Sequence, residues 1–196
     1  MTDLEESWAR TRTWLATARE LAVNAGGLVS AEDLQTFDEF LDENALQLAA
    51  DTLQDRGLER DDLSRPFWDA LQRGYENMAL NADATRCRFR ALEAECGFVE
   101  ARLTLNAGRK TGIFSDYRPD WNLGHGSAAG TLEITGARVT LEDCQTLNPG
   151  ETGVVRLHPI RPEAWADTRP GDRIDAHEGA RITGTATVLR VALKGS

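Results

Sequence analysis

The 196-residue sequence lacks any apolar run close to the ~20 residues that a membrane-spanning helix requires. Its first ten residues, MTDLEESWAR, begin acidic and contain no apolar stretch, so we expect no signal peptide. The three cysteines are odd in number and irregularly spaced, which disfavours a disulfide framework or a zinc site and favours reduced thiols. These absences predict a cytoplasmic protein that does not bind a membrane.

The sequence also lacks the motifs on which common enzyme classes depend. No Gly-x4-Gly-Lys-Ser/Thr loop is present to hold nucleotide phosphates, and residues 108–111 have the wrong spacing for one. His125, His158 and His177 are scattered along the chain. Ser127 lies outside any Gly-x-Ser-x-Gly nucleophile turn. We therefore predict no catalytic residues, no metal site and no cofactor, and a binding protein rather than an enzyme.

The net charge of −10 is confined to the first part of the chain. Residues 1–82 contain 17 aspartates and glutamates against seven arginines, whereas residues 83–196 contain 15 charged residues of each sign. An acidic surface attracts basic protein surfaces and repels nucleic acid, although it also simply keeps a protein in solution. The charge split favours a basic protein partner for residues 1–82, with solvation as the alternative.

The first 82 residues show helical periodicity of their apolar side chains. The predicted helices cover residues 3–24, residues 31–57 with an interruption near Asn44, and residues 65–78. Ser30 and Ser64 stand where N-caps are expected, and Gly26 follows the first helix as a natural stop. Three or four amphipathic helices with short connections indicate a small antiparallel bundle.

Residues 83–96 form a linker or an ambiguous segment. Cys87, Phe89 and Ala91 alternate with arginines as in a strand, yet the same stretch suits a helix that ends before Gly97. From Phe98 onward the apolar period is two, and turns rich in glycine, proline and asparagine follow. The strand candidates are residues 98–105, 130–135, 153–160, 173–178 and 181–191. Short strands without intervening helices predict an antiparallel sandwich or barrel.

Three blocks in the second half of the chain resemble the third domain of elongation factor Tu. They are VEARLTLNAGRKTGIFSDYRPDW at 99–121, LNPGETGVVRLHPI at 147–160 and HEGARITGTATVLRV at 177–191, in the same order as in that domain. The resemblance implies a six-stranded antiparallel β-barrel over residues 97–196. The expected fold is therefore α+β, with a small α-helical bundle over 1–82 followed by this barrel.

In elongation factor Tu, the third domain contacts the T arm of aminoacyl-tRNA and packs against the other domains. The resemblance implies that an RNA or domain contact here would use the Glu-Gly hairpin and nearby basic residues, and it carries over to Arg118, Glu178, Gly179 and Arg181 alone. Arg109 and Lys110 are added as further basic candidates for the same contact. Because residues 83–196 are neutral overall, phosphate neutralisation by the barrel is disfavoured.

Residues 28–57, LVSAEDLQTFDEFLDENALQLAADTLQDRG, resemble small helical immunity proteins of bacterial polymorphic-toxin systems. The shared pattern is a capped helix with an acidic, aromatic-rich centre and an Ala-Leu-rich second half. This resemblance implies that the chain neutralises a cognate toxin, and a nuclease toxin is basic because it must hold nucleic acid.

The sequence offers two kinds of candidate partner contact. Asp42 and Glu43, and likewise Asp61 and Asp62, form acidic pairs in the helical half. Trp121 and Trp165 fall in predicted barrel loops, where a large aromatic often anchors an interface, with packing in the core as the alternative. The remaining tryptophans, Trp8, Trp14 and Trp68, are expected in the helical core.

The leading hypothesis is a non-enzymatic protein-binding module, an immunity protein that neutralises a toxin through its acidic helical face. The alternative is a translation-linked factor whose barrel contacts tRNA or mimics the last domain of elongation factor Tu. Exposed aromatics beside acidic residues on the helices would favour the first. A continuous basic stripe through Arg109, Lys110, Arg118 and Arg181 would favour the second.

Overall fold

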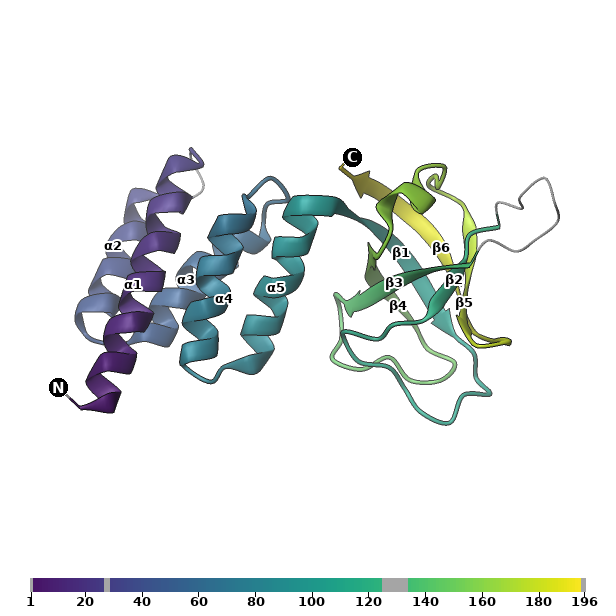
Figure 1. Ribbon diagram of the computed structural model, residues 1–196, viewed down its shortest axis with the longest axis horizontal. Coiled ribbons are helices and arrows are strands. Elements are labelled where there is room, and N and C mark those ends of the chain that lie inside the picture. The colour runs from purple at the N-terminus through teal and green to yellow at the C-terminus, as the bar shows by residue number, and fades with distance from the viewer. Residues whose placement is uncertain (1, 27–28, 125–133, 195–196) are drawn as a thin grey trace. The chain divides into compact units, whose positions relative to one another are not determined.

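The computed structural model describes residues 2–26, 29–124 and 134–194 of the chain. The chain forms two compact units, a helical unit (Met1–Glu95) and a barrel unit (Cys96–Ser196). Within the described residues, the first unit contains five α-helices and the second contains a closed six-stranded antiparallel barrel (Figure 1). The predicted α+β fold, with helices first and barrel second, is confirmed.

Local sequence signals set the limits of the helices. The five helices are α1 (Asp3–Asn24), α2 (Ala31–Asp42), α3 (Leu46–Leu58), α4 (Arg65–Asn77) and α5 (Asn81–Cys96). Thr2 and Ser30 begin α1 and α2 with capping boxes, in which each hydroxyl accepts from the backbone amide three residues later. Asn44 breaks the second predicted stretch into α2 and α3, because its φ of 60° ends a right-handed helix.

The stretch left open between strand and helix is part of α5. Ala84, Cys87 and Ala91 lie at helical spacing and are buried in the core of the helical unit. The strand-like alternation covers only residues 86–91, so the longer helical pattern prevails. The helical unit therefore continues beyond residue 82, through the segment that the sequence leaves as a linker or ambiguous.

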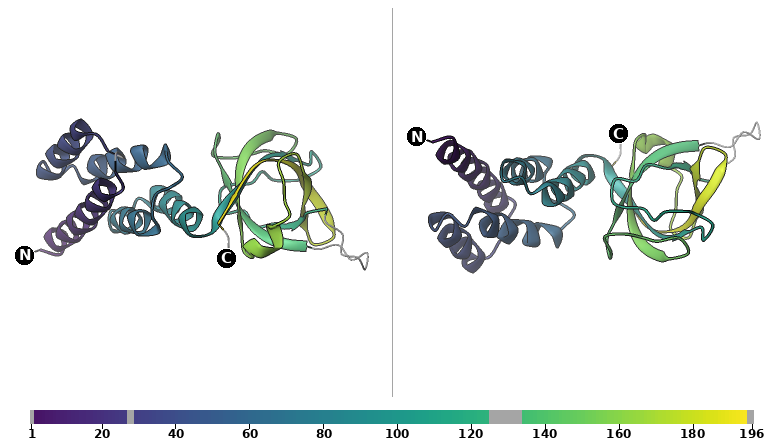
Figure 2. Two further views of the ribbon diagram at one scale, coloured as in Figure 1. Left: turned by 90° about the horizontal axis from the view of Figure 1, so that it is seen from above. Right: turned by 90° about the horizontal axis from the view of Figure 1, so that it is seen from below.

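The barrel is closed by pairing of its first and last strands. Its strands are β1 (Gly97–Leu105), β2 (Asp120–Asn122), β3 (Ile134–Leu141), β4 (Thr152–Pro159), β5 (Arg173–Glu178) and β6 (Arg181–Leu193). Their order around the barrel is β1-β4-β3-β2-β5-β6, and the ring is visible in Figure 2. The apolar periodicity of the sequence did not predict β2, which has only three residues. Residues 130–133 of the predicted strand 130–135 lie outside the described residues.

Trp121 and Trp165 are core residues of the barrel and not surface contacts. Both are 0% exposed, and their rings meet edge to face with centroids 6.3 Å apart. Trp121 lies on β2, where it pairs with Thr135 of β3 and Ala176 of β5. Because β2 was not predicted, Trp121 was assigned to a loop. Their predicted role as partner contacts is therefore corrected.

Gly97 permits the closing contact between β1 and β6. Its φ is +77°, and a Cβ there would clash with the carbonyl oxygen of Ala192 and lie 2.6 Å from Leu193 Cα. We expect Gly97→Ala to lower the free energy of unfolding by at least ~2 kcal/mol, measured by urea denaturation. Gly171→Ala is the matched control, because Gly171 has a φ of +94° but open space around it, and should cost about 1 kcal/mol. Equal losses would contradict the role of the β6 contact.

Candidate partner-binding site

The helical unit has an open groove where the start of α1 meets the α2–α3 turn and the end of α4. Its volume is about 580 Å³, and its apolar side chains are those of Leu4, Trp8, Leu46, Leu48 and Met78. Leu4, Trp8 and Leu48 are 56%, 41% and 50% exposed. Gathered exposed apolar side chains of this size are typical of interaction surfaces. We call this feature the α1 groove.

Two asparagines hold the walls of the α1 groove in place. The Nδ2 of Asn77, at the end of α4, lies 2.8 Å from the carbonyl oxygen of Ser7 and 2.7 Å from Thr11 Oγ1 on α1. Arg12, also on α1, donates to Asn44 Oδ1 at 3.2 Å. These hydrogen bonds fix the first half of α1 against the end of α4 and the α2–α3 turn.

Trp8 was predicted to be a core residue, and the structure corrects this. The buried face of α1 consists of Thr11, Leu15, Ala18 and Ala22. Residues 4 and 8 continue the same helical stripe, but their side chains are exposed in the α1 groove. Of the other two tryptophans, Trp68 is 2% exposed, and Trp14 is half-buried beneath the Arg73 guanidinium, 4.6 Å from the ring centroid. The sequence periodicity alone gives no sign of where the stripe leaves the core.

The four acidic candidates do not form one patch. Asp42 and Glu43 directly precede the α2–α3 turn that lines the α1 groove, and both are exposed. Asp61 and Asp62 follow α3 at the other end of the α2–α3 pair, where neighbouring Arg60 donates to the carbonyl oxygen of Gly26. The 12 residues of α2 span about 18 Å between these ends.

The two acidic pairs also differ in their local partners. Asp62 accepts from Arg60 at 2.5 Å, and Asp61 lies 3.8 Å from Arg90. Asp42 and Glu43 form no ion pair with any residue that the structure describes. They stand at the C-terminal end of α2, where negative charge is unfavourable to the helix dipole. Their position therefore offers uncompensated negative charge beside the α1 groove.

Four of the candidate barrel residues form one polar cluster. Arg109 Nη1 donates to Glu178 Oε1 at 2.8 Å and to the Tyr117 hydroxyl at 3.0 Å, and that hydroxyl donates to Glu178 at 2.8 Å. Arg181 donates to the carbonyl oxygen of Gly108 at 2.5 Å. Gly179 turns the β5–β6 hairpin with a φ of +59°. Sequence reasoning did not single out Tyr117, the central residue of the cluster.

The remaining basic candidates lie apart from this cluster's hydrogen bonds. Arg118 pairs with Asp116 at 3.0 Å, and Asp116 also pairs with Arg138 at 3.2 Å. Lys110 is exposed. Carboxylates thus neutralise Arg109 and Arg118, so these residues do not form a stripe of unpaired positive charge.

Electrostatics in the cluster follow from its hydrogen bonds. The hydrogen bonds from Arg109 and Tyr117 lower the pKa of Glu178 below its ordinary value of 4.5. Burial raises the pKa of Tyr117, so its hydroxyl remains protonated and donates. The hydrogen bonds of this cluster join the 106–109 loop, the Tyr117 segment and the β5–β6 hairpin.

Among the residues that the structure describes, no three histidine, cysteine, aspartate or glutamate side chains are placed to hold a metal ion. Burial raises the pKa of Cys87, so its thiol stays protonated and unreactive. In the same residues, no helix combines the length and apolar character needed to cross a bilayer.

No protein-family model matches the chain, and no curated protein matches its sequence. The resemblances to the third domain of elongation factor Tu and to immunity proteins therefore stay predictions.

The Glu178 ion pair predicts a pH-dependent contribution to stability. Because the folded-state pKa is lowered, the carboxylate stabilises the fold above its ordinary pKa, and this stabilisation is lost as the pH falls through the folded-state pKa. We expect Glu178→Gln to lower the free energy of unfolding by less than ~1 kcal/mol at neutral pH, because the Glu178 side chain is half exposed. In urea titrations, the difference from wild type should shrink as the pH falls through the lowered folded-state pKa of Glu178. A difference that is independent of pH would contradict this account.

Proposed function

We propose that the protein is a non-enzymatic binding protein whose helical unit captures a basic protein partner, as an immunity protein captures its toxin. The observation that carries this proposal is the α1 groove, in which exposed Trp8 and Leu48 lie beside uncompensated Asp42 and Glu43. Interfaces combine an apolar centre, often anchored by tryptophan, with a polar rim. The α1 groove has an apolar centre and an acidic rim.

The charge of the helical unit supports a basic partner. Residues 83–95 carry three charges of each sign, so the helical unit holds the whole net charge of −10. Asp3, Glu5 and Glu6 add negative charge around Leu4 on α1. A field of this sign accelerates encounter with a positively charged protein and repels nucleic acid. A nuclease toxin, which needs a basic surface, fits this description.

The ion pairs of the barrel weaken the translation-linked alternative. RNA affinity depends on cations that neutralise phosphates, and Arg109 and Arg118 are engaged by Glu178 and Asp116. Before these arginines could bind RNA phosphates, their ion pairs would have to break, and the free energy needed to break them would lower the affinity for RNA. The proposal therefore places partner recognition on the helices.

Trp8 provides the first test. The probe is the product of any toxin gene adjacent to the gene for this chain, co-expressed with wild type and variants. We expect wild type to relieve growth arrest and Trp8→Ser to weaken the complex by ~30-fold or more, as at an anchoring hot spot. Ile182→Ser on the barrel is the matched control, because Ile182 is 44% exposed, and should bind like wild type. Wild-type affinity in Trp8→Ser would overturn the groove assignment.

Charge reversal tests the role of the acidic rim. Asp42→Lys with Glu43→Lys should slow association by up to ~10-fold at 0.1 M salt, and the loss should shrink at 1 M, where the Debye length is ~3 Å. Asp61→Lys with Asp62→Lys should have a smaller effect, because these residues lie at the other end of α2 and α3. Equal effects from both pairs would contradict a localised site.

A tRNA pool distinguishes the alternative function. We expect no retention of tRNA by wild type at physiological salt. Retention that is lost when Arg109, Lys110 and Arg118 are changed to Glu would sink the proposal and favour the translation-linked factor.

A further inference from the structure

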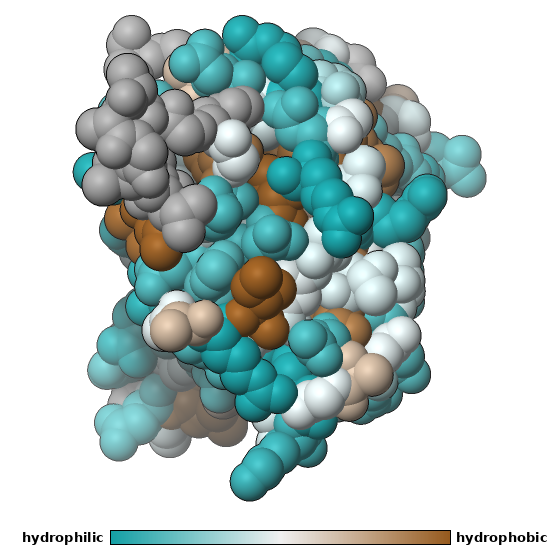
Figure 3. Space-filling view, turned by 90° about the vertical axis from the view of Figure 1, so that its right-hand side faces the viewer, coloured by the Kyte–Doolittle hydropathy of each residue, from teal (hydrophilic) through white to brown (hydrophobic). Residues whose placement is uncertain are grey.

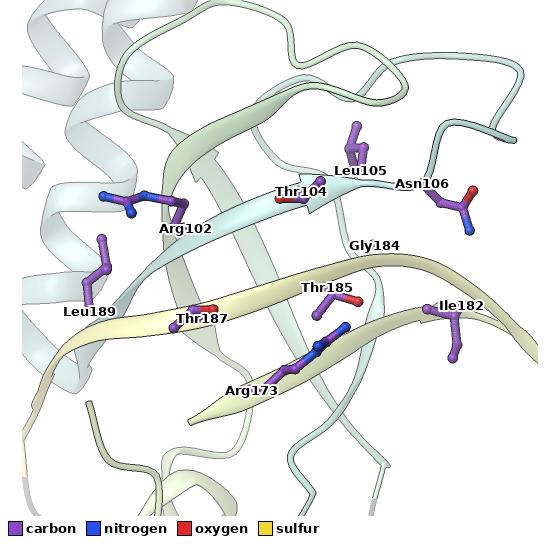
Figure 4. A pocket seen from close by; sticks show the side chains of 10 residues that line it. All are labelled: Arg102, Thr104, Leu105, Asn106, Arg173, Ile182, Gly184, Thr185, Thr187 and Leu189. Atoms are coloured by element: carbon purple, nitrogen blue, oxygen red, sulfur yellow. The ribbon is translucent and has the colours of Figure 1, made fainter. Parts of the chain in front are cut away.

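A shallow pocket of about 490 Å³ lies on the outer face of β1, β6 and β5 (Figure 4). Its charged lining residues are Arg102 of β1 and Arg173 of β5, and Thr187 of β6 lies between them. In the strand register, Arg102 pairs with Thr187, and Thr187 pairs with Arg173. Paired residues share one face of a sheet, so both arginines stand on the same face, with Cα atoms about 10 Å apart across β6.

These two arginines differ from most arginines of the barrel. Arg109, Arg118, Arg138, Arg156, Arg169 and Arg190 all form ion pairs. The side chains of Arg102 and Arg173 are exposed, and they form neither an ion pair nor a side-chain hydrogen bond with any described residue. Two uncompensated positive charges on one face repel each other, and an anion between them would relieve that repulsion.

Thr187 supplies an unused hydroxyl between the two arginines. Thr104 Oγ1 lies 2.8 Å from Thr152 Oγ1, and Thr185 donates to Asp175 at 2.8 Å, so these two hydroxyls are engaged. The exposed Thr187 hydroxyl has no side-chain hydrogen bond within the described residues. Figure 4 shows Arg173 extending toward Thr185 and Arg102 extending on the Leu189 side. Rotation about their side-chain bonds brings both guanidinium groups over Thr187.

Figure 3 shows a face of the barrel on which hydrophobic side chains form separate patches within a mostly hydrophilic surface. The pocket itself has no aromatic lining residue, and its apolar members Leu105, Ile182 and Leu189 lie around its edges (Figure 4). Asp175 of β5 lies two residues from Arg173 on the same strand, and the hydroxyl of Thr185 donates to it. Its negative charge opposes anion binding, so the attraction of the two arginines must outweigh this repulsion.

We propose that this pocket binds a phosphomonoester group, held by the forks of Arg102 and Arg173 and by the Thr187 hydroxyl. A phosphomonoester carries about −1.5 to −2 charges and three acceptor oxygens, enough for two guanidinium groups and a hydroxyl. A carboxylate or a phosphodiester has a single charge. Single-stranded RNA also needs a line of cations and aromatic surfaces for stacking, which the pocket lining lacks.

The test is a titration of the full chain with each probe, in which the backbone amide signals are monitored by NMR. The probes are inorganic phosphate, a phosphoserine peptide with its unphosphorylated form, a sugar monophosphate and a ten-nucleotide RNA, with chloride matching the ionic strength. We expect amide shifts at Thr187 and Arg173 with the phosphorylated probes, stronger at pH 7.5 than at pH 5, because the second phosphate ionisation has a pKa of about 6. Comparison of the peptide with the sugar monophosphate identifies the source of the group.

Variants give the decisive outcomes. Arg102→Ala and Arg173→Ala should each weaken phosphate binding at least tenfold, and Asp175→Asn should strengthen it. Arg161→Ala is the matched control and should bind like wild type, because Arg161 is exposed, lies outside the pocket and forms no ion pair with another described residue. Absence of shifts, phosphate binding that persists in the Arg102→Ala, Arg173→Ala double variant, or tighter binding of the RNA than of any monophosphate would overturn the proposal.

Discussion

Burial of apolar side chains within each unit is the constraint on which the surface features of the protein depend. The closed ring of β1–β6 leaves an interior that large side chains must fill, and Trp121 and Trp165 fill it. In the helical unit, the end of α4 is held against α1 at Ser7 and Thr11. Leu4 and Trp8 stay exposed in the α1 groove beside this contact. The proposed partner site therefore rests on the tryptophan that is exposed, Trp8, and not on the number of aromatic residues.

Much of the fold follows from local sequence signals. The capping residues Ser30 and Ser64 located the starts of α2 and α4, and the interruption near Asn44 corresponds to a residue with positive φ. The predicted strand 173–178 coincides with β5. The sequence could not reveal β2, because three residues show no period and its pairing with β3 and β5 depends on contacts distant in sequence. The same non-local pairing decided that Trp121 points inward.

The candidate sites were less predictable than the fold, because they depend on which charged side chains lie close together in the folded chain. The sequence presents Asp42, Glu43, Asp61 and Asp62 as equivalent acidic pairs, whereas the structure places Arg60 and Arg90 beside the second pair alone. The basic residues of the barrel divide in the same way. Arg109 pairs with Glu178, which is 69 positions away in the sequence, whereas Arg102 and Arg173 form no ion pair with any carboxylate among the described residues. Uncompensated charges of opposite sign thus mark different surfaces, acidic on the helices and basic on the β1–β6–β5 face of the barrel.

The central claim is that each unit is self-contained, so that the helices capture a partner without help from the barrel. The most direct measurement is circular dichroism with urea denaturation of residues 1–95 and 96–196, each produced separately. We predict that both fragments unfold cooperatively and that their summed spectra reproduce the spectrum of the full chain. An unfolded helical fragment, or a barrel fragment that folds only when the helices are present, would contradict the claim.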